Sequence, residues 1–475
     1  MTTSSLARHR ARRVGRPRFH NYAYAPLHAS GGFSPYEMAT LYGLPKLYEQ
    51  GIQFSPQTIA LIELGGGYDP AKINAFCDQY GIPHPAFTDL GVDGAKNSYT
   101  GDPNSADVEV ELDICCGLVW SYCTNTPTKF LMVFCPNSDT GFEHGIQQAP
   151  QHSSRPSACG ISWGQNENQT SGSSYIQTMD SNFQAGNQAG LTWCVASGDA
   201  GDSDGGTGKN CDFPSSSPYV VGCGATTIVV NNGAISNESP WNASGGATGG
   251  GYSDIEPVPS YQSGIAAATG RGVPDVCAAG DPATGWQTPF GVVGGTSAVA
   301  PFMAAYFAVV NAVREAVGLP RLGLVNPLLY QHPEDWFDIT SGNNTLARGL
   351  ITPHFPATQG WDPASGLGAL RGALSFQRLS GAQVQPPPPL KYSCVNGICV
   401  VDPNGQYATL AACQAVCGGG TAPPPPPPTQ QSLTDQFDQA FRGLEAIETN
   451  SGQKKVDAML NRYIDTRILQ LQGHP

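Results

Sequence analysis

Short runs of apolar residues, separated by stretches that mix apolar and polar positions, recur along the first 380 residues. Strands of a parallel sheet are buried on both faces and therefore appear as continuous apolar runs. Such runs occupy residues 58–64, 130–134, 159–163, 191–196 and 219–221. Because helical stretches lie between them, they predict an α/β fold, with helices on both faces of a parallel sheet and ligand-binding loops at the carboxyl ends of the strands.

Residues 294–301 (GGTSAVAP) and the apolar run 302–313 predict a tight turn followed by a buried helix. Ser297 then lies in the first helical turn, where unpaired backbone N–H groups and the positive end of the helix dipole can stabilise an oxyanion. A Ser or Thr that only caps a core helix gives the same pattern. Ser297 is therefore a candidate nucleophile only if a base lies beside it.

The segment 107–114 (DVEVELDI) contains the candidate base. None of the nine histidines is followed by Gly-Thr, the context expected of a subtilisin-type histidine base. The alternation of apolar and acidic residues is typical of a strand with a solvated acidic face. As the start of a helix, the same segment places Glu109 and Asp113 one turn apart, where two carboxyls can share a proton. Glu109 then serves as base toward Ser297, and Asp113 orients it.

Asp199 follows Ser-Gly at the end of the apolar run 191–196. At a strand end, such an aspartate commonly makes an Asx turn. If it instead faces the pocket and is protonated, it can donate a hydrogen bond to a tetrahedral oxyanion.

Composition narrows the class of protein. The chain has 24 Lys and Arg against 37 Asp and Glu, a formal net charge of -13, which argues against general nucleic-acid binding. Charged residues make up only 13%, so few surface carboxylates change state as the pH falls. Fourteen cysteines indicate an oxidising compartment, although the first residues do not resemble a signal peptide. We expect no membrane span, because no apolar run is long enough.

The two ends of the chain differ in composition from its middle. We predict, in chain order, a disordered basic arm (1–32), a catalytic domain (33–380), a Pro-rich linker (381–391), a Cys-rich module (392–418), a second linker (419–431) and a helical hairpin (432–472). The four cysteines of the module either bind zinc or form two disulfides, and we favour disulfides. The apolar stripes of the hairpin predict docking or self-association.

The order and context of these motifs resemble the sedolisins, the serine-carboxyl peptidases, and kumamolisin-like members above all. The similarity runs from about residue 34 to residue 379. The motifs are Glu109-x-x-x-Asp113, Ser197-Gly198-Asp199, 294–301, 62–68 (IELGGGY), 161–164 (ISWG), 212–214 (DFP) and 270–275 (GRGVPD).

The resemblance implies a subtilisin-like α/β fold and a role for each candidate residue. Ser297 is the implied nucleophile, Glu109 the general base and acid, Asp113 its support and Asp199 the oxyanion donor. The positions of Glu63 and Trp163 match a Glu and a Trp that extend the acidic network in kumamolisin-like relatives.

The resemblance also implies one structural calcium ion. Asp338 and Asp362 then supply carboxylate oxygens, and Ile339, Thr358 and Gly360 supply backbone carbonyls, a set of oxygen ligands that suits calcium. The alternative is a pair of Asp-containing turns without a metal.

Two features depart from the family pattern. Relatives are normally made with a long prosegment that blocks the site, whereas about thirty residues precede the predicted catalytic domain here. We therefore expect that the usual prosegment is missing, and that activity is controlled in another way. Cys115 and Cys116 follow Asp113 closely, and they either pair with Cys123 or Cys135 or remain reduced.

Together these observations predict an acid-active endopeptidase that cleaves proteins or peptides through an acyl-enzyme on Ser297. The alternative is a catalytically silent structural or particle-associated binding protein that retains the peptidase fold. We expect an acidic or extracellular-type compartment, or packaging in a particle.

Overall fold

A computed structural model of the chain describes residues 18–19 and 32–417, apart from 171, 207, 244, 266–267, 347–354, 396–397 and 403. The chain divides into two compact units, Met1–Gln414 and Ala415–Pro475. Of the second unit, only residues 415–417, the end of a helix, are described. The predicted linker 419–431 and hairpin 432–472 lie outside the described residues, as does most of the predicted arm 1–32.

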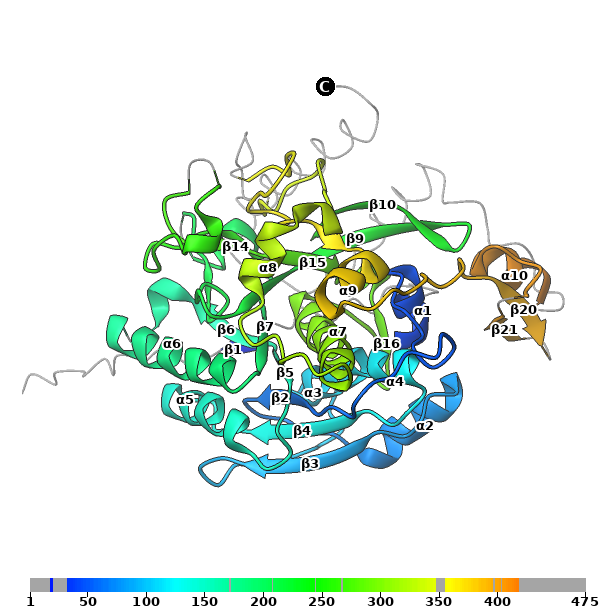
Figure 1. Cartoon of the computed structure of the whole chain (residues 1–475), viewed down its shortest axis with the longest axis horizontal. Helices are drawn as coiled ribbons and strands as arrows, with labels where there is room; N and C mark the ends of the chain where they lie inside the picture. Colours follow the sequence, from blue (N-terminus) through cyan, green and yellow to red (C-terminus); the bar gives the residue numbers. More distant parts are fainter. Residues whose placement is uncertain are drawn as a thin grey trace, which may run out of the picture. The chain divides into compact units, whose positions relative to one another are not determined.

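A ten-stranded, mostly parallel sheet forms the centre of the first unit (Figure 1). Its strand order is β18 (Trp336–Phe337), β19 (Ala369–Leu370), β15 (Val276–Ala279), β9 (Val221–Asn231), β7 (Thr192–Ala196), β5 (Ala158–Ile161), β2 (Ile59–Glu63), β4 (Lys129–Phe134) and β3 (Ala86–Gly91). β10 (Ala234–Pro240) pairs antiparallel with β9, and β18 pairs antiparallel with β19. The α/β fold and the apolar runs predicted as parallel strands are confirmed.

Helices cover both faces of this sheet. Side chains of a strand alternate between the two faces. In β2, Ile59 and Leu61 belong to the apolar cluster that includes α3 (Asp107–Gly117) and α7 (Thr296–Ala316), whereas Ala60 and Ile62 belong to the cluster that includes α5 (Asp139–Gln148) and α6 (Ser173–Gln188). Both faces of the strand are therefore buried, which explains why it reads as a continuous apolar run.

The helices connect the strands or cover their faces. They are α1 (Pro35–Leu41), α2 (Pro70–Tyr80), α3 (Asp107–Gly117), α4 (Val119–Thr124), α5 (Asp139–Gln148), α6 (Ser173–Gln188), α7 (Thr296–Ala316), α8 (Asn326–Gln331), α9 (Gly372–Ser380) and α10 (Leu410–Cys417). α1 begins at a capping box: Ser34 accepts a hydrogen bond from the Glu37 amide, and the Glu37 carboxylate accepts one from the Ser34 amide.

The remaining strands are short and lie outside the central sheet. They are β1 (Arg18–Phe19), β6 (Trp163–Asn166), β8 (Asp212–Phe213), β11 (Asn242–Ala243), β12 (Gly246–Ala247), β13 (Gly251–Tyr252), β14 (Gly272–Val273), β16 (Trp286–Thr288), β17 (Gly291–Val293), β20 (Tyr392–Val395) and β21 (Ile398–Val401). β1 pairs antiparallel with β6. Residues 18–19 are the part of the predicted basic arm that the structure describes, and disorder of the arm remains a prediction.

The prediction that no apolar run is long enough to span a membrane was wrong. By length and composition alone, α7 passes that test. All of its apolar window is buried inside the protein, and it packs against β5, β7 and α3. α7 is therefore the central core helix, which is apolar all round because protein surrounds it.

Residues 381–391 contain no helix or strand, yet they are not a free tether. Val384 and Leu390 are buried, and the Leu390 amide donates to the carbonyl of Gly233 at 2.9 Å. The side chain of Gln50 bonds both the amide and the carbonyl of Gln385. The extended segment is thus fixed along the surface of the first unit.

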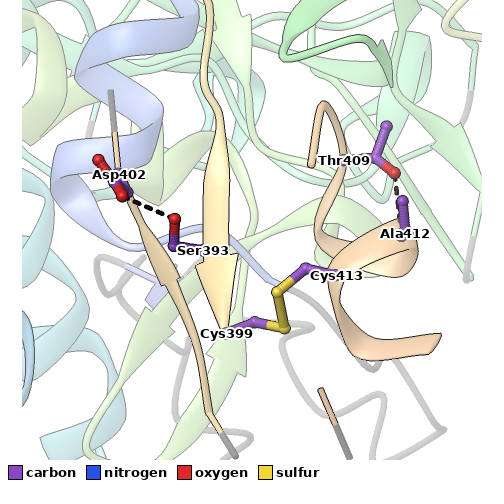
Figure 2. The surroundings of a disulfide bond; sticks show 6 residues. All are labelled: Ser393, Cys399, Asp402, Thr409, Ala412 and Cys413. Carbon is purple, nitrogen blue, oxygen red and sulfur yellow. Dashed lines mark hydrogen bonds between the residues drawn. A yellow bond between two sulfur atoms is a disulfide. The ribbon is translucent and has the colours of Figure 1, made fainter. Parts of the chain in front are cut away.

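The Cys-rich module contains a β20–β21 hairpin and α10. Cys399 and Cys413 form a disulfide, and Ser393 donates to Asp402 at 2.6 Å across the hairpin (Figure 2). Cys394 and Cys417 each take part in a disulfide as well. The prediction of disulfides rather than a zinc site is confirmed, because a sulfur in a disulfide is no longer the thiolate that zinc binds. In contrast, Cys115, Cys116, Cys123 and Cys135 are buried free thiols.

Candidate active site

Ser297 is the second residue of α7 and is completely buried. The turn before it depends on Gly295, which caps the helix with φ of 113°, a backbone conformation that favours glycine. The Gly295 amide donates to the Gly280 carbonyl at 2.6 Å, which ties this turn to the end of β15. The structure thus holds Ser297 at the amino end of a long helix, as predicted.

Glu109 and Asp113 lie one turn apart on α3, so the helical alternative for residues 107–114 is the one found. Every residue of α3 is buried, and the helix packs along α7. Asp107, at its start, accepts hydrogen bonds from the backbone of Thr100 and Gly101 at 2.7 and 2.8 Å, which fixes the preceding loop. The hydroxyls of Ser297 and Ser162 both lower the pKa of Glu109, which places these two groups near its carboxyl.

Ser162, at the carboxyl end of β5, connects the two helices. Its hydroxyl is placed to donate to Asp113 Oδ1 at 2.9 Å and to the carbonyl of Ser297 at 3.1 Å. The sequence offered Ser162 only as part of the ISWG motif and gave it no role. Its position directly after a buried strand was the available signal, because side chains at that edge of a parallel sheet converge.

Glu63 and Trp163 extend the group of acids away from Ser297. Glu63 is the last residue of β2, and its Oε2 accepts a hydrogen bond from the Trp163 indole at 3.2 Å. Both side chains are buried. The structure therefore brings together the two residues that the sequence paired only by resemblance.

Asp199 follows β7 and faces the first turn of α7. Its Oδ1 accepts hydrogen bonds from the amide and the hydroxyl of Thr296, at 2.8 and 2.7 Å. Its Oδ2 is buried and has no hydrogen-bond partner among the described residues. This arrangement differs from the Asx turn, and it leaves one carboxyl oxygen available beside Ser297. Thr296, which orients Asp199, was not singled out in the sequence.

These carboxyls hold their protons more tightly than exposed acids do. Burial raises the pKa of Glu63 to about 8 and that of Asp199 to about 7. Burial also raises the pKa of Glu109 and of Asp113 well above the ordinary range, and the negative charge of Glu63 adds to both shifts. The nearby hydroxyls of Ser297 and Ser162 act in the opposite direction and lower the pKa of Glu109. The site can therefore keep a carboxylic acid neutral as a hydrogen-bond donor.

The residues expected to bind calcium also lie together, in two neighbouring turns. Gly360 donates to Asp338 Oδ2 at 3.0 Å, and Thr358 donates to Asp362 Oδ2 at 2.9 Å. Asp338 Oδ1 is buried without a partner in the described part of the chain. Asp362 instead accepts several bonds from the backbone and side chain of residues 364–365, which shape its own turn.

Comparison with known proteins finds relatives that are similar in sequence. Kumamolisin of Bacillus sp. (strain MN-32) is 40% identical over 381 residues, which are 75% of this chain and 66% of that protein. Tripeptidyl-peptidase 1 of Rattus norvegicus is 35% identical over 248 residues, 46% of this chain and 42% of that protein. The chain thus spans about two thirds of the first relative and about two fifths of the second. No protein-family model matches it.

The structure of Pseudomonas sedolisin, a serine-carboxyl proteinase complexed with two molecules of pseudo-iodotyrostatin, superimposes with a TM-score of 0.62. It is 25% identical, and the match covers 74% of this chain and 99% of that chain. The subtilisin-like arrangement of sheet and helices is therefore shared along nearly the whole of that catalytic chain. By sequence and by fold, this chain belongs to the sedolisin family of serine-carboxyl peptidases.

Proposed function

We propose that this chain is an acid-active endopeptidase, with Ser297 as nucleophile, Glu109 as general base and acid, Asp113 as its support and Asp199 as oxyanion donor. The observation that carries the proposal is the convergence of buried carboxyls on the first turn of α7. Burying several acids together costs free energy, and the described structure offers no packing benefit in return. Such a cost is typical of a functional site.

In the proposed reaction, the Ser297 oxygen attacks the scissile carbonyl and its proton passes to Glu109. The negative oxygen of the tetrahedral intermediate accepts a hydrogen bond from protonated Asp199 and lies at the positive end of α7. Glu109 then gives the proton to the leaving amine, and an ester to Ser297 remains. Water attacks this ester as Glu109 takes its proton, and proton return to Ser297 releases the carboxylic acid product. Asp113 and Ser162 keep Glu109 and Ser297 in position.

The decisive experiment is a pH-rate profile on an unstructured protein substrate. Although burial raises the pKa of both carboxyls, the active form of this interacting group is the one in which Glu109 has lost its proton and Asp199 keeps its own, so we expect a bell-shaped profile. The alkaline limb should fall near pH 7, because burial raises the pKa of Asp199 to about that value. A maximum at or above pH 8 would exclude Asp199 as the protonated donor.

Two variants separate catalysis from binding. Ser297→Ala should lower kcat by roughly 10⁴-fold or more, because it removes the nucleophile. Asp199→Asn should lower kcat by about 10²- to 10³-fold, as loss of an oxyanion donor does. Labelling by a peptide aldehyde should require Ser297. A folded wild-type chain that resists the aldehyde and cleaves nothing would favour the silent, structural alternative.

We propose further that one calcium ion binds between the two Asp-containing turns. The buried, unpaired Oδ1 of Asp338 supports this, because an ionised carboxylate oxygen buried without a partner is costly. Asp362 and the carbonyls of Ile339, Thr358 and Gly360 complete a set of oxygen donors. The ion would neutralise the carboxylates and hold the turns together.

Removal of calcium should therefore lower the thermal unfolding midpoint of the wild-type chain. At free calcium 100 times its Kd, binding contributes about 2.7 kcal/mol to stability. A chelator should act on the wild type and leave Asp338→Asn unchanged. Equal midpoints with and without chelator in the wild type would contradict the metal site.

Substrates of a peptidase are proteins or peptides, and members of this family are typically secreted or lysosomal and active in acid. Both statements agree with the proposed acid optimum. We therefore include in the proposal that this chain works in an acidic or extracellular-type compartment.

A further inference from the structure

An open cavity of about 400 Å³, whose wall does not include Ser297, lies between α1, β10, β18 and the start of α9. Its wall includes Tyr42, Ile235, Glu238, Phe337, Arg371 and Leu374. None of these residues belongs to the acidic network or to the calcium turns. We call this cavity the Glu238 pocket.

A buried carboxyl forms one wall of the Glu238 pocket. Glu238 is only 5% exposed. The hydroxyls of Tyr42 and Thr226 both donate to its Oε1, at 2.6 Å each. Within the described part of the chain, Oε2 is therefore the oxygen left to meet a ligand. The register of β10 shifts between Ile235 and Asn237, just before Glu238, and such bulges re-aim side chains next to binding sites.

The rest of the pocket is apolar and carries a positive charge. Phe337 and Leu374 are 43% and 42% exposed, although both are large apolar side chains. The Arg371 guanidinium lies 5.4 Å from the centre of the Phe337 ring. A concave apolar wall with two polar groups of opposite charge is typical of a small-molecule site. A ligand that matches it carries a positive end, a negative end and an apolar body.

We propose that the Glu238 pocket binds an amino acid or short peptide with apolar side chains, whose ammonium group pairs with Glu238 and whose carboxylate pairs with Arg371. The choice of a peptide rests on the proposed peptidase function, because the pocket then takes the kind of product that the active site releases. The binding itself needs no turnover. Its test is therefore independent of catalysis.

The pH dependence of binding follows from the groups around Glu238. Burial raises the pKa of its carboxyl to about 7, and hydrogen bonds from Thr226 and Tyr42 oppose that shift. The other titratable groups that face it are Cys277, Tyr42 and Arg371. Because the pKa of Cys277 and that of Tyr42 are raised, these two groups stay neutral below pH 9. An ammonium ligand should thus bind more tightly at pH 8, where Glu238 is ionised, than at pH 5.5.

The test is isothermal titration calorimetry with leucyl-leucine at pH 8 and pH 5.5. We expect one site at pH 8, at least about tenfold weaker at pH 5.5. N-acetyl-leucyl-leucine, which lacks the ammonium group, should bind at least about tenfold more weakly at pH 8, as expected for loss of a charge-assisted hydrogen bond. Leucyl-leucinamide lacks the carboxylate that pairs with Arg371. It should therefore also bind more weakly than leucyl-leucine.

Two variants locate the site. Glu238→Gln and Leu374→Lys should each weaken binding at least about tenfold, whereas Glu49→Gln, at an exposed acid that does not line the pocket, should not. Leu374 is partly exposed, so its variant remains informative if Glu238→Gln fails to fold. No heat at 10 mM leucyl-leucine, or equal affinity in the wild type and Leu374→Lys, would overturn the proposal. Equal affinity would instead place the peptide in the active site.

Discussion

At the scale of single residues, Ser162 shows how one uncharged group can set the properties of several charged ones. Its hydroxyl contacts Asp113 and the carbonyl of Ser297, and it lowers the pKa of Asp113 and of Glu109 against the opposite effect of burial. It belongs to neither helix of the site. Its role is that of a positioning residue, since it acts through Glu109 and Asp113.

Ser162→Ala should therefore lower activity and change its pH dependence. Loss of a hydrogen bond to a buried carboxyl costs about 1–3 kcal/mol, or roughly 5- to 150-fold in kcat. The acid limb of the pH-rate profile should move to higher pH, because Glu109 and Asp113 then hold their protons more tightly.

Ser121→Ala is the matched control, since Ser121 on α4 is also buried and its hydroxyl bonds that of Thr128, directly before β4. It should leave the profile in place. A uniform loss of rate in Ser162→Ala, with no movement of the acid limb, would reduce Ser162 to a structural residue.

At the scale of elements, the sequence predicted the strands better than the helix that carries the acids. The run 58–64 is continuous because both faces of β2 are buried, so its pattern had one interpretation. In α3, acids and apolar residues alternate, yet all are buried. A helix that protein surrounds on all sides loses the 3.6-residue pattern, so periodicity left strand and helix open.

The candidate site residues likewise divide into those with a local signal in the sequence and those without one. Ser297 and Asp199 follow from local signals, a glycine turn before a helix and an acid after a strand. Thr296 and Ser162 become visible only when β5, β7 and α7 meet in space, and no spacing along the chain encodes that meeting. The roles of all four residues remain predictions until kinetics test them.

The Cys-rich module gives a prediction of its own. The amides of Tyr392 and Tyr407 each donate to the carbonyl of the other. The Cys399–Cys413 disulfide joins two cysteines that are 14 residues apart in the sequence. Replacing both cysteines by Ser should destabilise the module by up to about 3 kcal/mol. Hydrogen exchange at these two amides should speed up accordingly, while peptidase activity stays unchanged.

Thr409→Ala provides a graded comparison. Thr409 accepts a hydrogen bond from the Ala412 amide at the start of α10, and loss of such a cap costs about 1 kcal/mol (Figure 2). Its effect on exchange should be smaller than that of the double cysteine variant. Wild-type exchange rates in the double variant would mean that packing of Tyr392 and Leu390, and not the disulfide, holds the module.

At the scale of the whole molecule, buried acids outnumber the buried bases that could neutralise them. Glu63, Glu109, Asp113, Asp199 and Glu238 are all at most 5% exposed. Among the residues that the structure describes, Arg271 is the one buried Lys or Arg, and it pairs with Asp275. Because burial raises the pKa of each of these five acids, protons rather than cations neutralise them as the pH falls. The folded chain should therefore be more stable at acid pH than at neutral pH, whatever its catalytic mechanism.

Stability should consequently rise as the pH falls from 8 to 5. Burial raises the pKa of Glu63 to about 8 and that of Glu238 to about 7, so the folded state binds protons that the unfolded state releases above pH 4–5. The stabilisation is complete below the unfolded pKa and is lost as the pH rises through the folded pKa. For Glu238 it amounts to about 3 kcal/mol. Urea unfolding of Ser297→Ala, which cannot digest itself, measures this slope.

Glu238→Gln in the same background should flatten the slope between pH 5 and 8, because an amide does not titrate. Glu49→Gln, which changes the net charge equally at an exposed position, should leave it unchanged and so accounts for general repulsion in a chain of net charge -13. Stability that is constant or increases toward pH 8 would mean that the buried carboxyls are ionised in the folded state. A cation or an ordered donor would then have to neutralise them, and the same finding would remove the protonated Asp199 from the proposed mechanism.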